Sequence, residues 1–273
     1  MKRFPAFAAL QHEMGNYARS LHSRSRAIVA FLYLRMSALA LAWLALSLLL
    51  GLAKIATALS PVHGWADLAE LALPYMLIAL APVAGYLVAT GSFPRWKTAE
   101  QPSVRLARYG KWTPLEPAQA RANPAYGPTG FMASLLIGML LNIVVRTFEF
   151  MVAVPAMNSH APGWGQAIFH VMAADVIVMN FFYMVCFVMA LRSVPLFPRM
   201  LLYAWTIDIT MQLIVARHVA NHADLPPLVA TGLLDLLQGN VTKVLISAFV
   251  WLPYLMLSER VNVTYRCRSG ARG

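Results

Sequence analysis

The feature that most constrains this sequence is a series of apolar stretches, each long enough to cross a membrane. Nearly uncharged runs occupy residues 27–59, 68–90, 131–155, 167–191, 200–219 and 228–257. A helix of about 20 apolar residues crosses the roughly 30 Å hydrocarbon layer of a bilayer. Only 12% of the 273 residues are charged, whereas soluble domains carry about 25%. The sequence therefore predicts an all-α, polytopic membrane helical bundle with six transmembrane helices.

The distribution of positive charge predicts how this bundle is oriented. A net charge of +11 is compatible with nucleic-acid binding, but 17 of the 22 Lys and Arg lie in segments 1–26, 91–130, 192–199 and 258–273, which flank the apolar runs. Positive residues beside membrane spans are retained in the cytoplasm, where they attract anionic lipid. We therefore expect both termini in the cytoplasm, a multi-pass protein with anionic lipid at its cytoplasmic face, and no nucleic-acid partner.

The same pattern divides the chain into five parts. We expect a basic cytoplasmic N-terminal segment (1–26), a two-helix membrane extension (27–90), an irregular Pro-rich basic cytoplasmic linker (91–129), a four-helix membrane unit (130–257) and a basic cytoplasmic tail (258–273). The two cysteines, Cys186 in an apolar run and Cys267 in the tail, are expected to remain free.

The end of the last apolar run carries a recognisable motif. Residues 250–265 read VWLPYLMLSERVNVTY, in which Trp251, Pro253, Tyr254, Ser258, Glu259 and Arg260 lead into Val261, Thr264 and Tyr265. This string resembles the closing signature of a bacterial membrane family known only as domain of unknown function 2569. The resemblance covers about residues 125–268 and implies a bacterial inner-membrane location. It implies no activity, because the family has none established.

The residues of this motif suit the edge of a membrane. Trp251 and Tyr254 are amphipathic rings typical of the interface, Pro253 is expected to bend the emerging helix, and Glu259 and Arg260 are expected to pair near the lipid headgroups. We interpret the motif chiefly as an interfacial anchor, with a substrate or headgroup site at Arg260 as the alternative.

Ionisable residues inside the apolar runs are the strongest candidates for function. Each costs about 2.5–3.5 kcal/mol at the bilayer centre, so each needs a partner or a purpose. The six candidates for a substrate or ion site are Arg146, Glu149, Asp175, Asp208, Asp235 and Lys243. Two cations against four carboxylates leave two acids unmatched.

Helical spacing predicts how some of these residues are arranged. Ser134, Gly138, Asn142, Arg146 and Glu149 lie three or four residues apart, so they form one polar face that is expected to point into the bundle. Counted at about 1.5 Å per residue, Arg146 and Asp175 lie at similar depths, which predicts an ion pair. Asp175 and Asn180 are about 140° apart on a helix and are expected to face different neighbours.

A second candidate is a metal site at the non-cytoplasmic face. His218 and His222 are four residues apart on one predicted helix face, and a third ligand from His160 or His170 would complete a catalytic-type site. Surface histidines are the plainer interpretation, and the Glu of an HExxH motif is missing.

These observations support three hypotheses. The first is a non-enzymatic protein, which is transporter-like, lipid-handling or active in membrane assembly and uses the six ionisable residues. The second is a membrane enzyme with a metal at His218 and His222. The third is a non-catalytic scaffold for a membrane-protein partner or a homo-oligomer. No cofactor-binding motif is present in the sequence.

Overall fold

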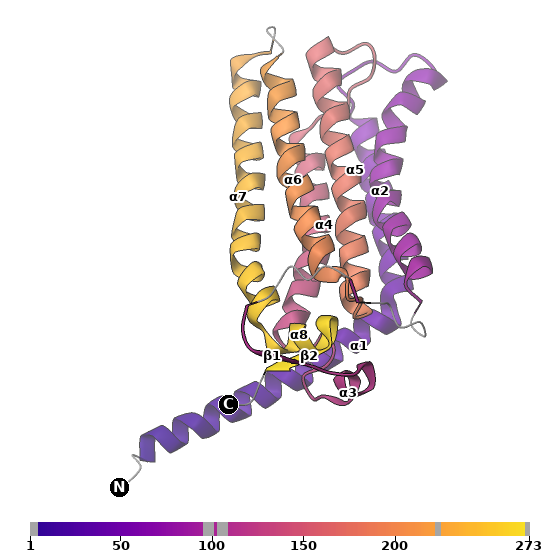
Figure 1. Cartoon of the computed structure of the whole chain (residues 1–273). Helices are drawn as coiled ribbons and strands as arrows, with labels where there is room; N and C mark the ends of the chain where they lie inside the picture. Colours follow the sequence, from indigo (N-terminus) through magenta and orange to yellow (C-terminus); the bar gives the residue numbers. More distant parts are fainter. Residues whose placement is uncertain (1–4, 95–100, 103–108, 222–224, 271–273) are drawn as a thin grey trace.

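The computed structural model describes residues 5–94, 101–102, 109–221 and 225–270, with side chains from residue 23 onward. Its long helices are α1 (Pro5–Ala56), α2 (Trp65–Ser92), α4 (Phe131–Ala153), α5 (Gly163–Leu191), α6 (Phe197–Ala220) and α7 (Pro227–Leu257). The short elements are β1 (Trp112–Pro114), α3 (Pro117–Ala122), α8 (Glu259–Arg266) and β2 (Arg268–Gly270). The long helices run side by side, and the short elements gather at one end, which we call the base (Figure 1).

Five of the long helices are apolar and long enough to cross a membrane: α1, α2, α4, α5 and α7. This confirms a helical architecture of the membrane-spanning type. Helix α6 is the exception, although its 24 residues lie between α5 and α7 (Figure 1). Its low hydropathy comes partly from Asp208 and Gln212, both of which are buried. Asp208 and Gln212 therefore point into the protein, and the 24 residues of α6 are enough to cross a bilayer.

Helix α5 is the centre of the bundle. It packs against α2, α4 and α6, and Tyr183–Leu191 is an unbroken buried run. The approach of α2 is close because Gly85 has no side chain: a Cβ there would lie 2.7 Å from the carbonyl oxygen of Phe181. A helix that is apolar on every side is expected in such a position.

The predicted two-helix extension packs directly on the four-helix unit. Tyr75 of α2 lies in an aromatic group with Phe150 and Phe169, at ring-centroid distances of 6.1 and 5.8 Å. At the end of α5, Arg192 donates through Nη1 to the carbonyl oxygens of Thr90 (2.8 Å) and Phe93 (2.5 Å). These contacts give the two parts a shared core.

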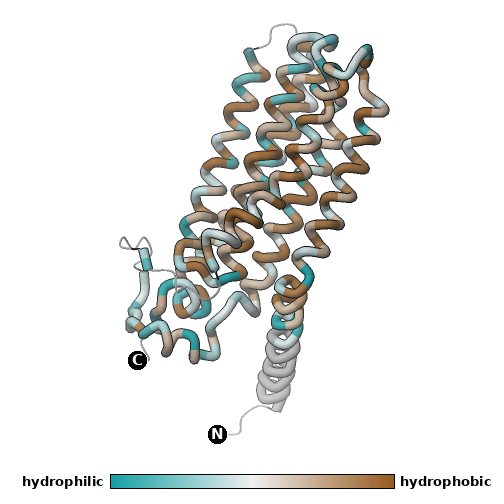
Figure 2. Tube along the Cα trace, turned by 90° about the vertical axis from the view of Figure 1, so that its right-hand side faces the viewer, coloured by the Kyte–Doolittle hydropathy of each residue, from teal (hydrophilic) through white to brown (hydrophobic). Residues whose placement is uncertain are grey.

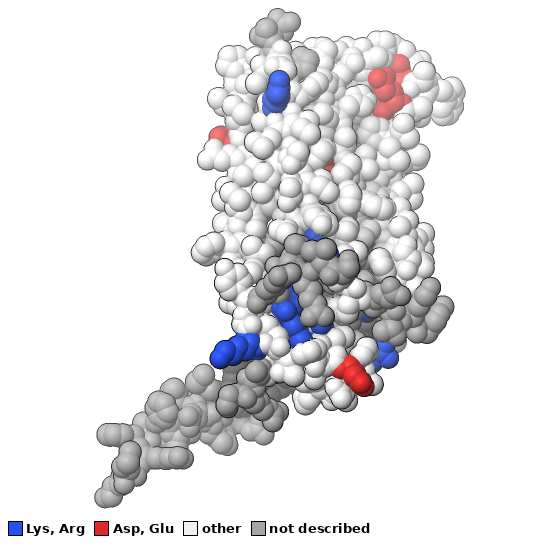
Figure 3. All heavy atoms as spheres, viewed as in Figure 1, with Lys and Arg blue, Asp and Glu red and all other residues white. Residues whose placement is uncertain are grey.

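The flank of the bundle is apolar and its ends are polar. Large apolar side chains such as Leu49, Val152 and Phe249 are exposed along the flank. The tube of Figure 2 is mainly brown along the long helices and turns teal towards their ends. On the face drawn in Figure 3, most Lys and Arg atoms lie near the base. A bilayer around the flank would cover this apolar surface.

The linker and the tail are more ordered than the sequence suggested. β1 in the linker pairs antiparallel with β2 in the tail, with Trp112 opposite Gly270 and Pro114 opposite Arg268. Helix α8 buries Val261, Val263 and Tyr265 against the base, and the Tyr265 hydroxyl donates to the Ala190 carbonyl oxygen at 2.8 Å. The irregular linker that we expected contains two short elements, β1 and α3. The pairing of β1 was not predicted, because main-chain pairing with a segment more than 150 residues away cannot be read from local sequence.

Candidate functional site

Three buried charges from three helices meet at one point. Arg146 of α4 places Nη1 2.7 Å from Oδ2 of Asp175 on α5 and Nη2 2.5 Å from Oδ1 of Asp208 on α6. The remaining carboxylate oxygens are also satisfied, since Gln212 donates to Asp175 at 3.0 Å and Tyr183 donates to Asp208 at 2.7 Å. The predicted Arg146–Asp175 pair is therefore present, as part of a triad that also contains Asp208.

The triad is closed to its surroundings. The three charged side chains are at most 7% exposed, and each carboxylate oxygen accepts one hydrogen bond. One cation between two carboxylates leaves a formal charge of −1. Because an uncompensated buried charge is costly, these four donors are what make the arrangement tolerable.

A chain of polar side chains continues from the triad to α7. Asn240 donates through Nδ2 to Oε1 of Gln212 at 3.3 Å, and Lys243 donates to Oδ1 of Asn240 at 3.3 Å. Lys243 also forms an ion pair with Glu149 of α4. The chain thus joins α4, α5, α6 and α7, and it brings five of the six candidate residues into one network.

Asp235 does not belong to this network. Its side chain is exposed on α7, and it makes no ion pair or side-chain hydrogen bond with any residue that the structure describes. The grouping of Asp235 with the other five was wrong. Residue count gives the depth of each side chain along its helix. It does not give the rotation of α7 about its axis, which decides whether Asp235 faces the other charged residues.

The polar face of α4 is only partly buried. Arg146 is buried, Asn142 and Glu149 are half-buried, and Ser134 and Gly138 are exposed. The expectation that the whole face points into the bundle was wrong, because α7 lies apart from α4 along part of its length.

The space between these helices, together with part of α6, is a groove of about 270 Å³. Its polar lining comes from Asn142, Tyr183, Lys243 and Ser247. The other lining residues are Leu135, Gly138, Met139, Leu141, Val145, Leu201, Trp205, Val244 and Trp251. We call this space the α4–α7 groove. Tyr183 and Lys243 belong both to the groove lining and to the polar network, so the groove reaches the network at two points.

Asp175 and Asn180 both contact α4, contrary to expectation. Asn180 donates to the Thr147 hydroxyl at 2.8 Å, while Asp175 binds the adjacent Arg146. Asp175 also accepts a hydrogen bond from Gln212 of α6 at 3.0 Å, so the two residues share α4 as a neighbour and only Asp175 contacts α6 as well.

The histidines do not assemble into a metal site among the described residues. His222 lies outside the described residues, and no group of three or more His, Cys, Asp or Glu in the described part of the chain is placed to hold a metal. His160 instead lies 3.3 Å from the Asp67 carboxylate, and His170 lies 2.9 Å from the carbonyl oxygen of Gln166. Because His222 is not described, the His218–His222 metal site stays a prediction.

The closing motif contacts protein at most of its positions. The ring of Phe131 lies 4.7 Å from that of Trp251 and 5.0 Å from that of Tyr254. Pro253 lies inside α7, which continues to Leu257.

After α7, Ser258 is the junction between α7 and α8. The Arg260 guanidinium donates to the Thr129 hydroxyl at 2.8 Å, whereas Glu259 is exposed and the two form no ion pair. The expected Glu259–Arg260 pair was wrong. Arg260 instead ties the tail to the linker.

Sequence reasoning missed Tyr183 and Asn240 as members of the network. Each is a polar side chain inside an otherwise apolar run, and Asn240 precedes Lys243 by three residues, which places it on the same helix face. That spacing was the available signal for Asn240. Tyrosine is common enough in membrane helices that Tyr183 gave no comparable signal.

No protein-family model, curated protein or solved structure matches this chain.

Proposed function

We propose that this is a bacterial inner-membrane protein with six spans and both termini in the cytoplasm, and that it binds a membrane amphiphile in the α4–α7 groove. We also propose membership of the family of domain of unknown function 2569, supported by the closing motif of residues 250–265. The function is lipid handling, with no chemical conversion of the bound molecule.

Two observations support the six-span topology. Helix α6 packs between two apolar helices and buries Asp208 and Gln212 away from the flank, so it crosses beside them without exposing these groups to lipid. The base also carries Arg192 at the end of α5, Arg199 at the start of α6 and Arg260 in α8, which agrees with a cytoplasmic base.

The α4–α7 groove is the single observation that carries the functional proposal. In a membrane-facing cleft, lipid chains require only apolar walls. This groove adds Asn142, Ser247 and Lys243, and the Lys243 side chain is 49% exposed near the middle of α7. Lys243 is paired with Glu149, yet its side chain stays half-exposed at that depth, so it can also donate to a polar group of a ligand that reaches below the headgroup level.

The closed triad gives the groove its shape. Each carboxylate oxygen of Asp175 and Asp208 accepts a hydrogen bond, and the Arg146 guanidinium bonds to both carboxylates. The three residues hold α4, α5 and α6 together, while Gln212 and Asn240 extend the network to α7. In this role the network is a rigid frame for Tyr183 and Lys243, because satisfied buried polar networks fix one arrangement of their helices.

A photoactivatable lipid tests this function. Purified full-length protein is placed in nanodiscs that contain phosphatidylethanolamine with a diazirine in one acyl chain, irradiated, and mapped by mass spectrometry. We expect adducts on residues 135–145 of α4 and 244–251 of α7, and we expect Gly138→Leu to remove them, because a side chain at Gly138 enters open space in the groove.

Ile137→Phe is the matched control. Ile137 is next to Gly138 but 41% exposed on the lipid-facing side, so this variant should keep the groove adducts. The proposal fails if Gly138→Leu and Ile137→Phe leave the same adduct pattern as the unmodified protein, or if the groove is labelled no more than Val152 on the outer flank.

The scaffold hypothesis is supported by a different observation, the burial of the triad between three helices. If the protein only holds a partner, the groove would be filled by a helix of that partner. Adducts would then be absent from the groove in a purified complex and would appear once the partner is removed.

A further inference from the structure

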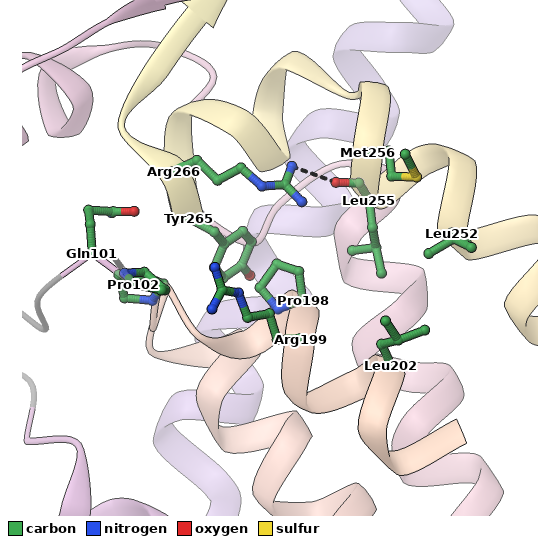
Figure 4. Close-up of a pocket in the computed structure, with 11 residues that line it drawn as sticks. Gln101, Pro102, Pro198, Arg199, Leu202, Leu252, Leu255, Met256, Tyr265 and Arg266 are labelled. Atoms are coloured by element: carbon green, nitrogen blue, oxygen red, sulfur yellow. Dashed lines mark hydrogen bonds between the residues drawn. The ribbon is translucent and has the colours of Figure 1, made fainter. Parts of the chain in front are cut away.

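A second cavity lies at the base, between the start of α6, the end of α7 and α8. It has a volume of about 330 Å³, and Gln101 and Pro102 of the linker form one of its walls. In Figure 4 these two linker residues lie on one side and Leu252 on the opposite side. We call this cavity the basal pocket.

The polar lining of the basal pocket is cationic. Arg199 and Arg266 both line it, and no Asp or Glu is among its described lining residues. Arg266 is held in place because its Nη1 donates to the Leu255 carbonyl oxygen at 2.7 Å and to the Asn262 amide oxygen at 3.0 Å. The Arg199 side chain forms no hydrogen bond or ion pair with a described residue. The pocket therefore contains positive charge that no described acid neutralises.

The ionisation of Arg266 reflects these surroundings. Burial, followed by repulsion from the nearby guanidiniums of Arg268 and Arg199, lowers the pKa of Arg266 to about 10. The group remains charged at neutral pH. A bound anion would reduce both the repulsion between the arginines and the cost of their burial.

The opposite wall of the pocket is apolar. Leu202 of α6 lies there with Leu252, Leu255 and Met256 of α7. Leu252 is 37% exposed, so this wall continues onto the apolar flank of the bundle. The cationic part lies at the end of the long helices, where lipid headgroups would be.

We propose that the basal pocket binds the phosphate-bearing headgroup of an anionic membrane lipid, with the lipid chain along Leu202 and Leu252. Guanidinium groups match phosphate oxygens in charge and geometry, and the adjoining apolar wall distinguishes a lipid from free phosphate. The site is separate from the α4–α7 groove, so it stands whether or not the groove binds an amphiphile.

Native mass spectrometry of the full-length protein in detergent tests this site. The probes are phosphatidylglycerol and phosphatidylcholine with identical chains, and inorganic phosphate as a competitor. We expect phosphatidylglycerol to be retained in preference to phosphatidylcholine. Arg199→Gln should weaken its binding about fivefold, since each basic residue near a charged lipid contributes roughly 1 kcal/mol. The Arg199→Gln, Arg266→Gln double variant should weaken it further.

The matched control removes two charges from the same end of the protein. Arg26 and Lys111 are exposed and lie outside the pocket, so the Arg26→Gln, Lys111→Gln variant should bind as the unmodified protein does. Three results would overturn the proposal: equal retention of the two lipids, equal weakening by the control variant, or displacement of phosphatidylglycerol by millimolar inorganic phosphate. If the double variant does not fold, the single variant Arg199→Gln still tests the site. It should fold normally, because the Arg199 side chain makes no hydrogen bond or ion pair with a described residue.

Discussion

At the scale of single residues, the charge balance of the triad separates its members. Removing Arg146 leaves Asp175 and Asp208 buried beside each other without a cation. Removing the charge of Asp208 leaves one cation against one carboxylate. The two substitutions touch the same network but have opposite effects on its net charge.

We therefore predict that Arg146→Met lowers the free energy of unfolding by about 3–5 kcal/mol, the usual cost of breaking a buried ion pair from one side. Asp208→Asn should cost much less, because it keeps polar atoms at the same position and removes the excess negative charge. Thermal unfolding of both variants in the same detergent measures the difference. Equal losses would show that the charge balance does not control stability here.

A second residue-scale prediction concerns the thiol of Cys267. Burial raises its pKa, and hydrogen bonding from Gln101 and the charge of Arg121 only partly oppose this. Because the thiolate is the reactive form, Cys267 should react with iodoacetamide at pH 7 more slowly than a cysteine in an unstructured peptide. The rate for Cys267 should keep rising at pH values at which the rate for the peptide has already levelled off.

Mass spectrometry of the alkylated protein measures this rate. Cys186 is fully buried, so a Cys267→Ser variant gives the background. A Cys267 rate equal to that of the peptide at every pH would contradict the prediction.

At the scale of elements, the contact between α2 and α5 depends on the absence of a side chain at Gly85. Gly85→Ala would place a methyl group 2.7 Å from the carbonyl oxygen of Phe181, a main-chain atom that cannot turn away. Overpacking of this kind costs about 1–3 kcal/mol, more than the roughly 0.5–1 kcal/mol that alanine gains over glycine inside a helix.

We predict that Gly85→Ala lowers the midpoint of thermal unfolding, whereas Gly138→Ala leaves it unchanged or raises it. Gly138 is also inside a long helix, but no atom lies within 4 Å of the position of its Cβ. The pair of variants separates helix propensity from packing. A Gly85→Ala protein as stable as Gly138→Ala would mean that α2 and α5 move apart without cost.

Helices α6 and α8 illustrate what local sequence indicates about an element. The sequence predicted α6 nearly to its ends, because residues 200–219 continue an apolar helical pattern around Asp208. Helix α8 was interpreted as part of a basic tail, since four arginines dominate the composition of residues 258–273. Its buried residues Val261 and Tyr265 are four apart, which is a helical spacing, but one such pair in an eight-residue segment is too short a pattern to predict a docked helix.

At the scale of the whole molecule, the two ends of the bundle differ in charge. The base carries most of the arginines whose side chains are described, while the opposite end holds Asp67 and Glu70 near the loop that contains Ser159 and His160. The proposed topology places the base in the cytoplasm.

We predict that a membrane-impermeant maleimide added to intact spheroplasts labels a Ser159→Cys variant and leaves Cys267 unmodified. Ser159 is exposed in the loop between α4 and α5. Cys267 should react only after permeabilisation, at a pH at which it is reactive. Labelling of Cys267 in intact spheroplasts together with protection of Ser159→Cys would reverse the proposed orientation.

The sequence by itself determined the helical membrane-type architecture and the positions of α2, α4, α5, α6 and α7, because length and hydropathy are local properties that a bilayer requires. It did not predict that α1 begins at Pro5 and is continuous with the first apolar run. It also identified Arg146 and Asp175 as partners, since depth along a helix follows from residue count. The tertiary structure alone decided that Asp208 completes the triad, that Asp235 stands outside it, and that α4 and α7 leave a groove. It also decided that Arg199 and Arg266 face one pocket. The physical reason is that the rotation of each helix and its distance from its neighbours are set by side-chain packing between segments far apart in the chain.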